Sequence, residues 1–230
     1  MEINILQMIP GARAAEGIAV IIDVFRAFTV EAYIMRGGAG KLIAVGDGNI
    51  AYEYKKKDKS CVLIGERGGV KLPGFDFGNS PSEIKNADFA GKTVIHTTSA
   101  GTQGLANAVR AEEILTGSFV NARATAEYIK AKNPPCVSLV CMGLSAIRPT
   151  EEDDLCAEYI KALLSGEIPD ISERIKALKN TSGAKFFDPA QSAVFPAEDF
   201  YLCTETDVFN FALKAKRGEN GLCYIEKTDI

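Results

Sequence analysis

The amino-acid sequence predicts an α/β protein, a three-layer α/β/α sandwich around a largely parallel, mixed sheet. Short apolar segments alternate with amphipathic segments through the first two thirds of the chain, an order typical of parallel strands covered by helices on both faces. Hydrophobic residues make up 47% and charged residues 24% of the 230 residues, which argues against disorder. We expect a single domain over 1–230, in which the region after about residue 144 is an added helical and hairpin part.

Short runs of apolar residues identify the strands of this sheet. In chain order they lie at 17–23, 41–45, 61–65, 92–98, 112–117 and 136–143. Amphipathic segments between and after these runs predict the helices. The helices are expected at 26–36, 48–57, 100–110, 121–131, 150–166 and 171–180. Gly37 ends the first helix, because glycine is favoured just beyond a helix C-terminus.

The stretch at 207–227 has a different pattern. Apolar and polar residues alternate on each side of the sequence Gly-Glu-Asn-Gly at 218–221. Alternation around a cluster of turn-forming residues predicts an antiparallel hairpin. We place this hairpin at an edge of the sheet.

Charge and hydrophobicity exclude two classes of partner. The net charge is -4, and the basic run at 55–57 is interrupted by Asp58, so no nucleic-acid surface is expected. The longest apolar run, 17–25, is too short to span a bilayer, and the first residues, MEINILQ, lack the features of a signal peptide. We therefore expect a cytoplasmic protein that binds neither nucleic acid nor membrane, with a homodimer as the common default.

The cysteines and the histidine narrow the chemistry further. The six cysteines form no Cys-X-X-Cys pair, which argues against a zinc site or a redox dithiol. The single histidine, His96, lies inside the strand predicted at 92–98, where a packed core residue is more common than a catalytic one. A bound metal should therefore have oxygen ligands, which points to Mg²⁺.

Ligands of open α/β sheets bind beyond the C-terminal ends of the strands. This rule selects four loops, at 23–26, 65–83, 97–102 and 143–154. The chemically active side chains of the sequence fall within these loops, and we expect the loops to form one site.

The first and last of these loops carry acids. Asp23 ends a strand, where it can hold a metal, act as a nucleophile or cap the helix that Arg26 opens. A haloacid-dehalogenase phosphatase would need a second acid two residues later, where Phe25 stands. In the last loop Arg148 precedes four acids at 151–154. The helix dipole explains some of these acids, and one or two can reach a metal.

The two middle loops suit anions. Loop 97–102 has hydroxyls and glycines before a helix, which attracts phosphate or simply caps the helix. It lacks the Gly-Lys-Ser/Thr sequence of a nucleotide-binding P-loop. Loop 65–83, GERGGVKLPGFDFGNSPSE, combines glycines for tight turns with Pro73 and Pro81, which restrict the backbone. This composition indicates a shaped loop rather than a flexible linker.

The segments DVFRAFT, GERGGVKLPGFDFGNSP, TTSAGT, LTGSFVNA and EEDDLCA occur in an order and at spacings that resemble the 2-phosphosulfolactate phosphatase family. The resemblance spans about 18–157 and, more loosely, the rest of the chain. It implies a three-layer α/β/α fold and a Mg²⁺-dependent phosphatase. Such an enzyme converts 2-phospho-3-sulfolactate to 3-sulfolactate and phosphate, on the way to coenzyme M.

The resemblance and the strand-end rule together assign roles to residues. The expected catalytic residues are Asp23, Arg26, Glu66 and Asp153. The expected Mg²⁺ ligands are Asp23, Glu66 and Asp153, with Glu152 as a substitute ligand. The residues expected to bind a small anionic phosphorylated substrate are Arg67, Asn79, Thr97, Thr98, Ser99, Gly101, Thr102 and Arg148. Arg26 and the turn at 97–102 would hold the phosphate, and Arg67 and Arg148 the other anions.

Two further hypotheses stay open. One is a phosphatase that acts on another phosphorylated hydroxy acid. The other is a non-catalytic protein that binds an anionic metabolite.

Overall fold

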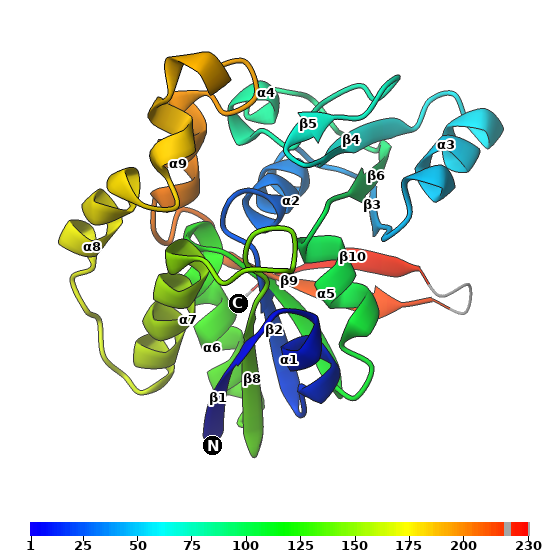
Figure 1. Ribbon diagram of the computed structural model, residues 1–230. Helices are drawn as coiled ribbons and strands as arrows, with labels where there is room; N and C mark the ends of the chain where they lie inside the picture. The colour runs from blue at the N-terminus through cyan, green and yellow to red at the C-terminus, as the bar shows by residue number, and fades with distance from the viewer. Residues whose placement is uncertain (219–221, 230) are drawn as a thin grey trace.

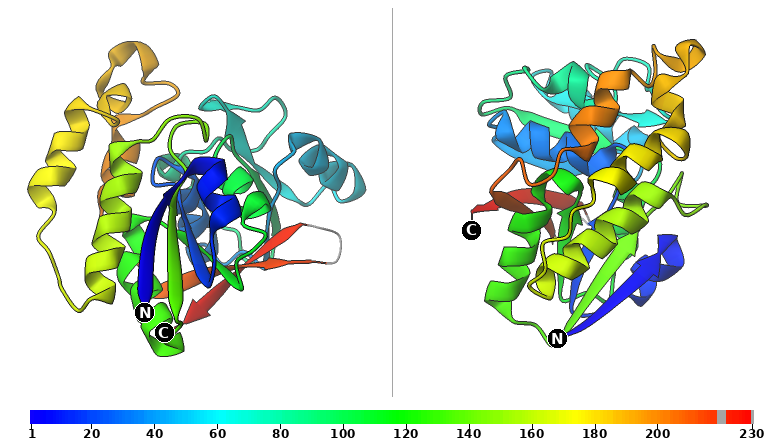
Figure 2. Two further views of the ribbon diagram at one scale, coloured as in Figure 1. Left: turned by 60° about the horizontal axis from the view of Figure 1, so that its bottom comes forward. Right: turned by 90° about the vertical axis from the view of Figure 1, so that its left-hand side faces the viewer.

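The computed structural model describes residues 1–218 and 222–229 and confirms the α/β class (Figure 1). Within these residues a mixed sheet of ten strands forms the middle layer, and helices cover both of its faces (Figures 1 and 2). The spatial order of the strands is β1-β8-β2-β7-β9-β10-β3-β6-β4-β5. Their bounds are β1 Glu2–Gln7, β2 Ile18–Ile22, β3 Lys41–Ala44, β4 Val62–Arg67, β5 Val70–Lys71, β6 Thr93–Thr97, β7 Glu113–Gly117, β8 Cys136–Cys141, β9 Phe211–Arg217 and β10 Cys223–Asp229.

The helices pack on the sheet through alternate residues of its strands. Their bounds are α1 Met8–Ala14, α2 Ala27–Arg36, α3 Gly48–Lys57, α4 Pro81–Ile84, α5 Gly101–Asn107, α6 Ala122–Lys132, α7 Glu151–Leu164, α8 Ser172–Ala177 and α9 Ala197–Thr204. Every residue of β2 is buried. Val20 and Ile22 belong to the core cluster of α6 and α7, whereas Ala19 and Ile21 belong to that of α1, α2 and α5. Cover on both faces explains why this strand is apolar without interruption.

The C-terminal hairpin lies inside the sheet, so its predicted place at an edge is wrong. β9 pairs antiparallel with β7, and β10 pairs antiparallel with β3. Phe211, Ala212 and Leu213 are consecutive and all buried, because both faces of β9 are covered and both of its edges are paired. Three adjacent apolar residues indicate such an interior strand. The middle of the predicted turn, 219–221, lies outside the described residues.

Several elements were not predicted from the sequence pattern: helix α1, the short β5 and α4, helix α9 and two 3-10 turns before α9. Strand β1 coincides with the strand-like start of the sequence, MEINILQ, whereas helix α1 contains Pro10 and Gly11, which obscure a helical pattern. Proline is nevertheless tolerated in the first turn, where its missing N–H has no helical partner. The helix expected at 171–180 ends in a 3-10 turn at Leu178–Asn180, and two further 3-10 turns, at Ala184–Phe187 and Pro189–Gln191, precede α9.

Helix α2 lies between the two parallel parts of the sheet. The residues from Ala27 to Ile34 are all buried, including the polar Thr29 and Glu31. Figure 1 shows β2 and β8 running in a different direction from β9 and β10. The sheet thus turns around α2 and brings the loops after β2 and β8 toward the loops after β4 and β6.

No helix within the described ranges is both long and apolar enough to cross a membrane. The cytoplasmic location and the homodimer stay predictions.

The interior position of β9 predicts the effect of truncating one of its side chains. Leu213→Ala removes a fully buried side chain and should lower the free energy of unfolding by about 2–4 kcal/mol. Ile168→Ala, at a site that is 70% exposed, is the matched control and should cost less than about 0.5 kcal/mol. Urea unfolding measures both values, and equal effects would contradict the interior placement.

Candidate active site

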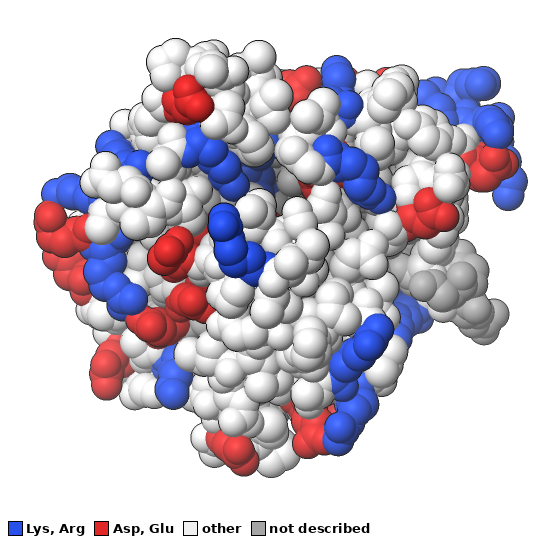
Figure 3. All heavy atoms as spheres, viewed as in Figure 1, with Lys and Arg blue, Asp and Glu red and all other residues white. Residues whose placement is uncertain are grey.

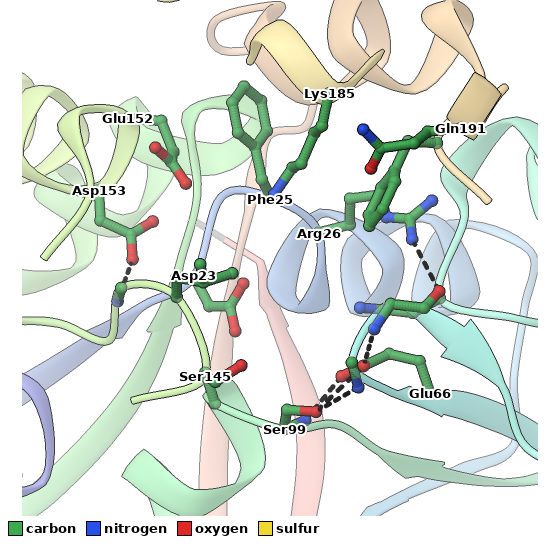
Figure 4. A pocket seen from close by; sticks show the side chains of 17 residues that line it. Asp23, Phe25, Arg26, Glu66, Ser99, Ser145, Glu152, Asp153, Lys185 and Gln191 are labelled. Carbon is green, nitrogen blue, oxygen red and sulfur yellow. Dashed lines mark hydrogen bonds between the residues drawn. The ribbon is translucent and has the colours of Figure 1, made fainter. Parts of the chain in front are cut away.

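A cavity of about 390 Å³ lies where all four predicted loops converge (Figure 4). The loop after β2 contributes Asp23, Phe25 and Arg26. The end of β4 contributes Glu66, and the glycine-rich stretch after it contributes Gly68, Gly69 and Asn79. Ser99 and Ala100 follow β6, and Gly143, Leu144, Ser145, Glu152 and Asp153 follow β8. Lys185, Gln191 and Phe195 complete the wall from a segment that the sequence analysis did not assign to the site.

Asp23 stands at the centre of this cavity, between the other acids (Figure 4). It directly follows β2, and its Oδ1 accepts a hydrogen bond of 3.2 Å from the backbone N of Ala27 at the start of α2. Burial, together with the negative charges of Glu66 and Glu152, raises its pKa to about 7. Asp23 can therefore gain or lose a proton near neutral pH.

Asp153 and Glu152 approach Asp23 from the first turn of α7. Asp153 accepts hydrogen bonds of 2.8 Å from the backbone N of Val24 and of Gly143, which ties the loops after β2 and β8 together. Burial and the charges of Glu152 and Asp23 raise its pKa well above the ordinary value. Burial also raises the pKa of Glu152, whose Oε2 is buried without a hydrogen-bond partner.

The other two acids of this turn have no part in the cavity. Glu151 is exposed, and Asp154 accepts a hydrogen bond of 2.7 Å from Gln7. Glu152 and Asp153, the two acids of this turn that the family resemblance selected, are the two that line the cavity.

Glu66 holds the glycine-rich loop against the loop after β6. Its carboxylate accepts hydrogen bonds from the backbone N of Gly69 at 2.6 Å and from the backbone N of Ser99 at 2.7 Å (Figure 4). The Ser99 hydroxyl donates a third, at 3.1 Å. Gly69 has φ +85°, and a Cβ there would lie 2.4 Å from the ring of Phe195, so both conformation and space require glycine.

Arg26 lies in the cavity wall as a buried ion pair with Asp199. Its Nη1 donates to Asp199 Oδ2 at 2.6 Å and to the carbonyl of Val194 at 2.9 Å, and its guanidinium lies 4.8 Å from the centre of the Phe195 ring. Asp199 also accepts from the Ser80 hydroxyl and from the backbone N of Ser82, both at 2.9 Å. It therefore joins α9 to the glycine-rich loop and to Arg26.

The sequence analysis missed Asp199 and Lys185. Asp199 follows Glu198 in the first turn of α9, where both acids suit the helix dipole, so position alone did not distinguish the buried acid from the exposed one. Lys185 lies in a short 3-10 turn and points toward the cavity beside Phe25 (Figure 4). Burial lowers its pKa, and the nearby Glu152 charge opposes that effect.

Several predicted substrate-binding residues support the cavity from behind. Thr98 and Thr102 bond to each other, since the Thr102 hydroxyl donates to the Thr98 carbonyl and accepts from its N–H. Thr97 accepts a hydrogen bond from Arg67, which also donates to the carbonyls of Glu66 and Gly46. None of these four side chains lines the cavity.

Of the remaining predicted substrate-binding residues, some lie at the cavity and one lies outside it. Gly101 packs against Asp23, and a Cβ there would lie 3.0 Å from Asp23 Oδ2. Asn79 lines the cavity, as Ser99 does. Arg148 is exposed and faces a neighbouring hollow of about 480 Å³, whose wall also includes Lys185. The structure therefore brings together the four predicted acids, Arg26, Asn79 and Ser99, and leaves Arg67 and Arg148 outside.

Charge around the site is mixed. In Figure 3 Lys and Arg side chains border a hollow in this face of the molecule, and most of the Asp and Glu side chains in view lie farther out. No three His, Cys, Asp or Glu side chains within residues 1–218 and 222–229 are arranged as a ready metal site.

The chain matches one family over nearly its whole length. A family model described as 2-phosphosulpholactate phosphatase matches residues 3–218, a range that includes every residue of the cavity. The chain is 33% identical over 221 residues to a probable 2-phosphosulfolactate phosphatase of Bacillus subtilis, which is 94% of this chain and 95% of that protein. A protein of the same description from Caldicellulosiruptor saccharolyticus is 42% identical over 157 residues, 66% of this chain and 64% of that protein.

The raised pKa of Asp23 predicts a pH-dependent gain in stability when its charge is removed. The unfolded chain loses this proton near pH 3.8 and the folded protein near pH 7, so the carboxyl lowers stability as pH rises between these values. Without divalent cations, Asp23→Asn should raise the free energy of unfolding at pH 8 by on the order of 2–4 kcal/mol and change little below about pH 4. Urea unfolding across this range measures the difference. Glu127→Gln, at an exposed acid, should show no such trend; a pH-independent difference for Asp23→Asn would refute the assignment.

The buried ion pair predicts a large cost for removing Asp199. Asp199→Ala leaves the Arg26 guanidinium buried without its partner and should lower the free energy of unfolding by about 3–5 kcal/mol. Glu198→Ala removes the adjacent acid, which pairs with Lys85 at the surface, and should cost less than about 1 kcal/mol. Chemical denaturation of the two variants compares them, and similar values would show that the Arg26 pair does not hold this region.

Proposed function

The chain belongs to the 2-phosphosulfolactate phosphatase family, and we propose that it hydrolyses 2-phospho-3-sulfolactate to 3-sulfolactate and phosphate. The observation that carries this proposal is the convergence of Asp23, Glu66, Glu152 and Asp153 with Arg26 on one cavity at the strand ends. A volume of about 390 Å³ suits a small organic anion. The family's motif residues thus meet where a substrate of the family's type would fit.

We further propose that the enzyme uses Mg²⁺, and two features of the cavity fit this ion. Its donors are carboxylate oxygens, which Mg²⁺ prefers, and Glu152 Oε2 is a buried acceptor without a partner. Mg²⁺ keeps several waters and commonly takes only one or two carboxylates together with a substrate phosphate, so a ready cage of three residues is not required. When bound, the ion would polarise the phosphoryl group and offset its negative charge.

Asp23 and Glu152 are the proposed ligands with free acceptor capacity. Glu66 and Asp153 already accept several hydrogen bonds. Glu66 accepts from two backbone N–H groups and from the Ser99 hydroxyl, and Asp153 accepts from two backbone N–H groups. We therefore assign these two acids chiefly to shaping the loops, with a metal contact through their remaining lone pairs. A bound cation would offset the repulsion among these four carboxyl groups and allow them to lose their protons.

Asp23 is also the candidate for proton or phosphoryl transfer. As a carboxylate in the cavity it can act as a general base toward an attacking water, or it can attack phosphorus itself. An acid quench during turnover distinguishes the two routes, because only direct attack leaves a phosphorylated Asp23 peptide for mass spectrometry.

Lys185 and Arg26 supply positive charge for the substrate. Lys185 reaches the cavity beside Phe25 (Figure 4) and can pair with a phosphate, carboxylate or sulfonate oxygen. Arg26 adds charge beside the cavity, although its Nη1 is held by Asp199 and Val194. These groups serve the role that the sequence analysis gave to Arg67 and Arg148.

The proposal predicts metal-dependent phosphate release with a preference for the sulfonate. Purified protein should release phosphate from 2-phospho-3-sulfolactate with Mg²⁺ and lose at least about 100-fold in rate with EDTA. 2-Phospholactate, which lacks the sulfonate, should show a kcat/KM lower by about tenfold or more. Equal or better turnover of 2-phospholactate would favour a phosphatase for another hydroxy acid, and binding without turnover would favour the non-catalytic protein.

Glu152 gives a matched pair of variants for the same assay. Glu152→Gln removes a buried charge at the proposed ion and should raise the Mg²⁺ concentration for half-maximal rate by about tenfold or more. Glu151→Gln changes the exposed neighbour and should leave that concentration unchanged. An equal Mg²⁺ requirement in the two variants would remove Glu152 from the proposed ligands.

A further inference from the structure

Three polar side chains form a buried row that ends at the cavity. Glu31 Oε1 on α2 lies 3.0 Å from His96 Nδ1 on β6, and His96 Nε2 lies 3.3 Å from Asn79 Oδ1 in the glycine-rich loop. Glu31 and His96 have no exposed surface, and Asn79 is 5% exposed. Of the three, only Asn79 lines the cavity. His96 is therefore buried, as the sequence predicted, and through its contact with Asn79 it is connected to the cavity.

The contact with Asn79 fixes where the imidazole proton lies. An amide oxygen only accepts hydrogen bonds, so His96 Nε2 must donate to Asn79 Oδ1. On the other side of the ring, either a protonated Glu31 donates to Nδ1 or a charged imidazolium donates to a Glu31 carboxylate. Burial raises the pKa of Glu31, and its Oε2 is buried without a hydrogen bond. Both arrangements keep the proton on Nε2.

The backbone around Asn79 is held on both sides. The backbone N of Gly78 donates to Glu83 at 2.8 Å, and the Ser80 hydroxyl donates to Asp199 at 2.9 Å. With the backbone fixed, the remaining freedom of Asn79 is the direction of its amide. The two directions differ for an anion in the cavity, because one offers N–H donors and the other offers a partial negative charge on oxygen.

We propose that His96 is a positioning residue: by holding Asn79 Oδ1, it turns the Asn79 amide N–H groups toward an anionic oxygen of the substrate. The class of substrate rests on the proposed function, whereas the position of the proton does not. Glu31 sets the state of His96 from the far side of the ring. The orientation of the Asn79 amide in the cavity wall thus depends, through His96, on Glu31 in the middle of α2.

The single histidine makes the proton directly observable. Long-range ¹H–¹⁵N correlation spectra of uniformly labelled protein contain one native imidazole, provided that any purification tag is removed. The expected spectrum shows Nε2 protonated in the substrate-free protein. A spectrum with Nδ1 protonated and Nε2 bare would overturn the proposal, whether or not the chain proves to be this phosphatase.

A double-mutant cycle tests the route through Asn79. Glu31→Leu combined with His96→Phe replaces the buried pair by apolar side chains of similar size, which avoids leaving one partner unsatisfied. This variant should raise KM by about tenfold, with a smaller change in kcat, as expected for the loss of one hydrogen bond to a charged group. In an Asn79→Ala background the same pair of changes should have little further effect on KM.

The cycle has outcomes that contradict the proposal. An unchanged KM in the folded double variant, checked by circular dichroism, would overturn it. An equal rise in KM with and without the Asn79 amide would show that the pair acts only through the fold. If the double variant does not fold, Glu31→Gln replaces it, and its nuclear magnetic resonance spectrum shows whether His96 Nε2 keeps its proton. If Nε2 keeps the proton, KM should stay within about twofold of wild type; if Nε2 loses it, KM should rise. A raised KM with the proton on Nε2, or an unchanged KM without it, would refute the role of His96.

Discussion

Mutual repulsion among buried carboxyl groups is the constraint around which this structure is organised. Asp23, Glu66, Glu152 and Asp153 meet in one cavity, and bringing four such groups out of water is costly unless each finds donors, cations or protons. The fold supplies all three kinds of compensation. Backbone N–H groups of Gly69, Ser99, Val24 and Gly143 point at the acids, Lys185 and Arg26 bring positive charge, and raised pKa values keep protons on some of them.

The same contacts also hold the loops in place. Glu66 connects the loop after β4 to that after β6, and Asp153 connects the loop after β2 to that after β8. The two pairs of loops meet across Gly101, which lies against Asp23 with no room for a larger residue. The charge in the cavity and the architecture of its loops therefore depend on the same carboxylates, so a change at one of them should affect both.

Local patterns in the sequence were enough to predict most of the elements and the loops of the site. The helix at 48–57 has the predicted bounds, because its amphipathic pattern and flanking residues are both local. The acids at or beyond the C-terminal ends of β2, β4 and β8 were identified by the family resemblance together with the rule that ligands bind at strand ends. Asp199, Lys185 and the Glu31–His96 pair were not, because their significance comes from residues distant in the chain. Nothing near Glu31 indicates that α2 is buried on all sides. Likewise, nothing near Arg67 indicates that its guanidinium donates to Thr97 and Gly46 instead of lining the cavity.

The interior hairpin has a consequence for how the polypeptide acquires its shape during synthesis. β9 and β10 follow all the other strands in chain order, yet they supply every hydrogen-bonded pairing between β7 and β3. Until they leave the ribosome, the two parallel portions of the nascent sheet have open inner edges and no ladder between them. Such edges can pair with other chains, so we expect this protein to need protection by chaperones until translation has passed β10.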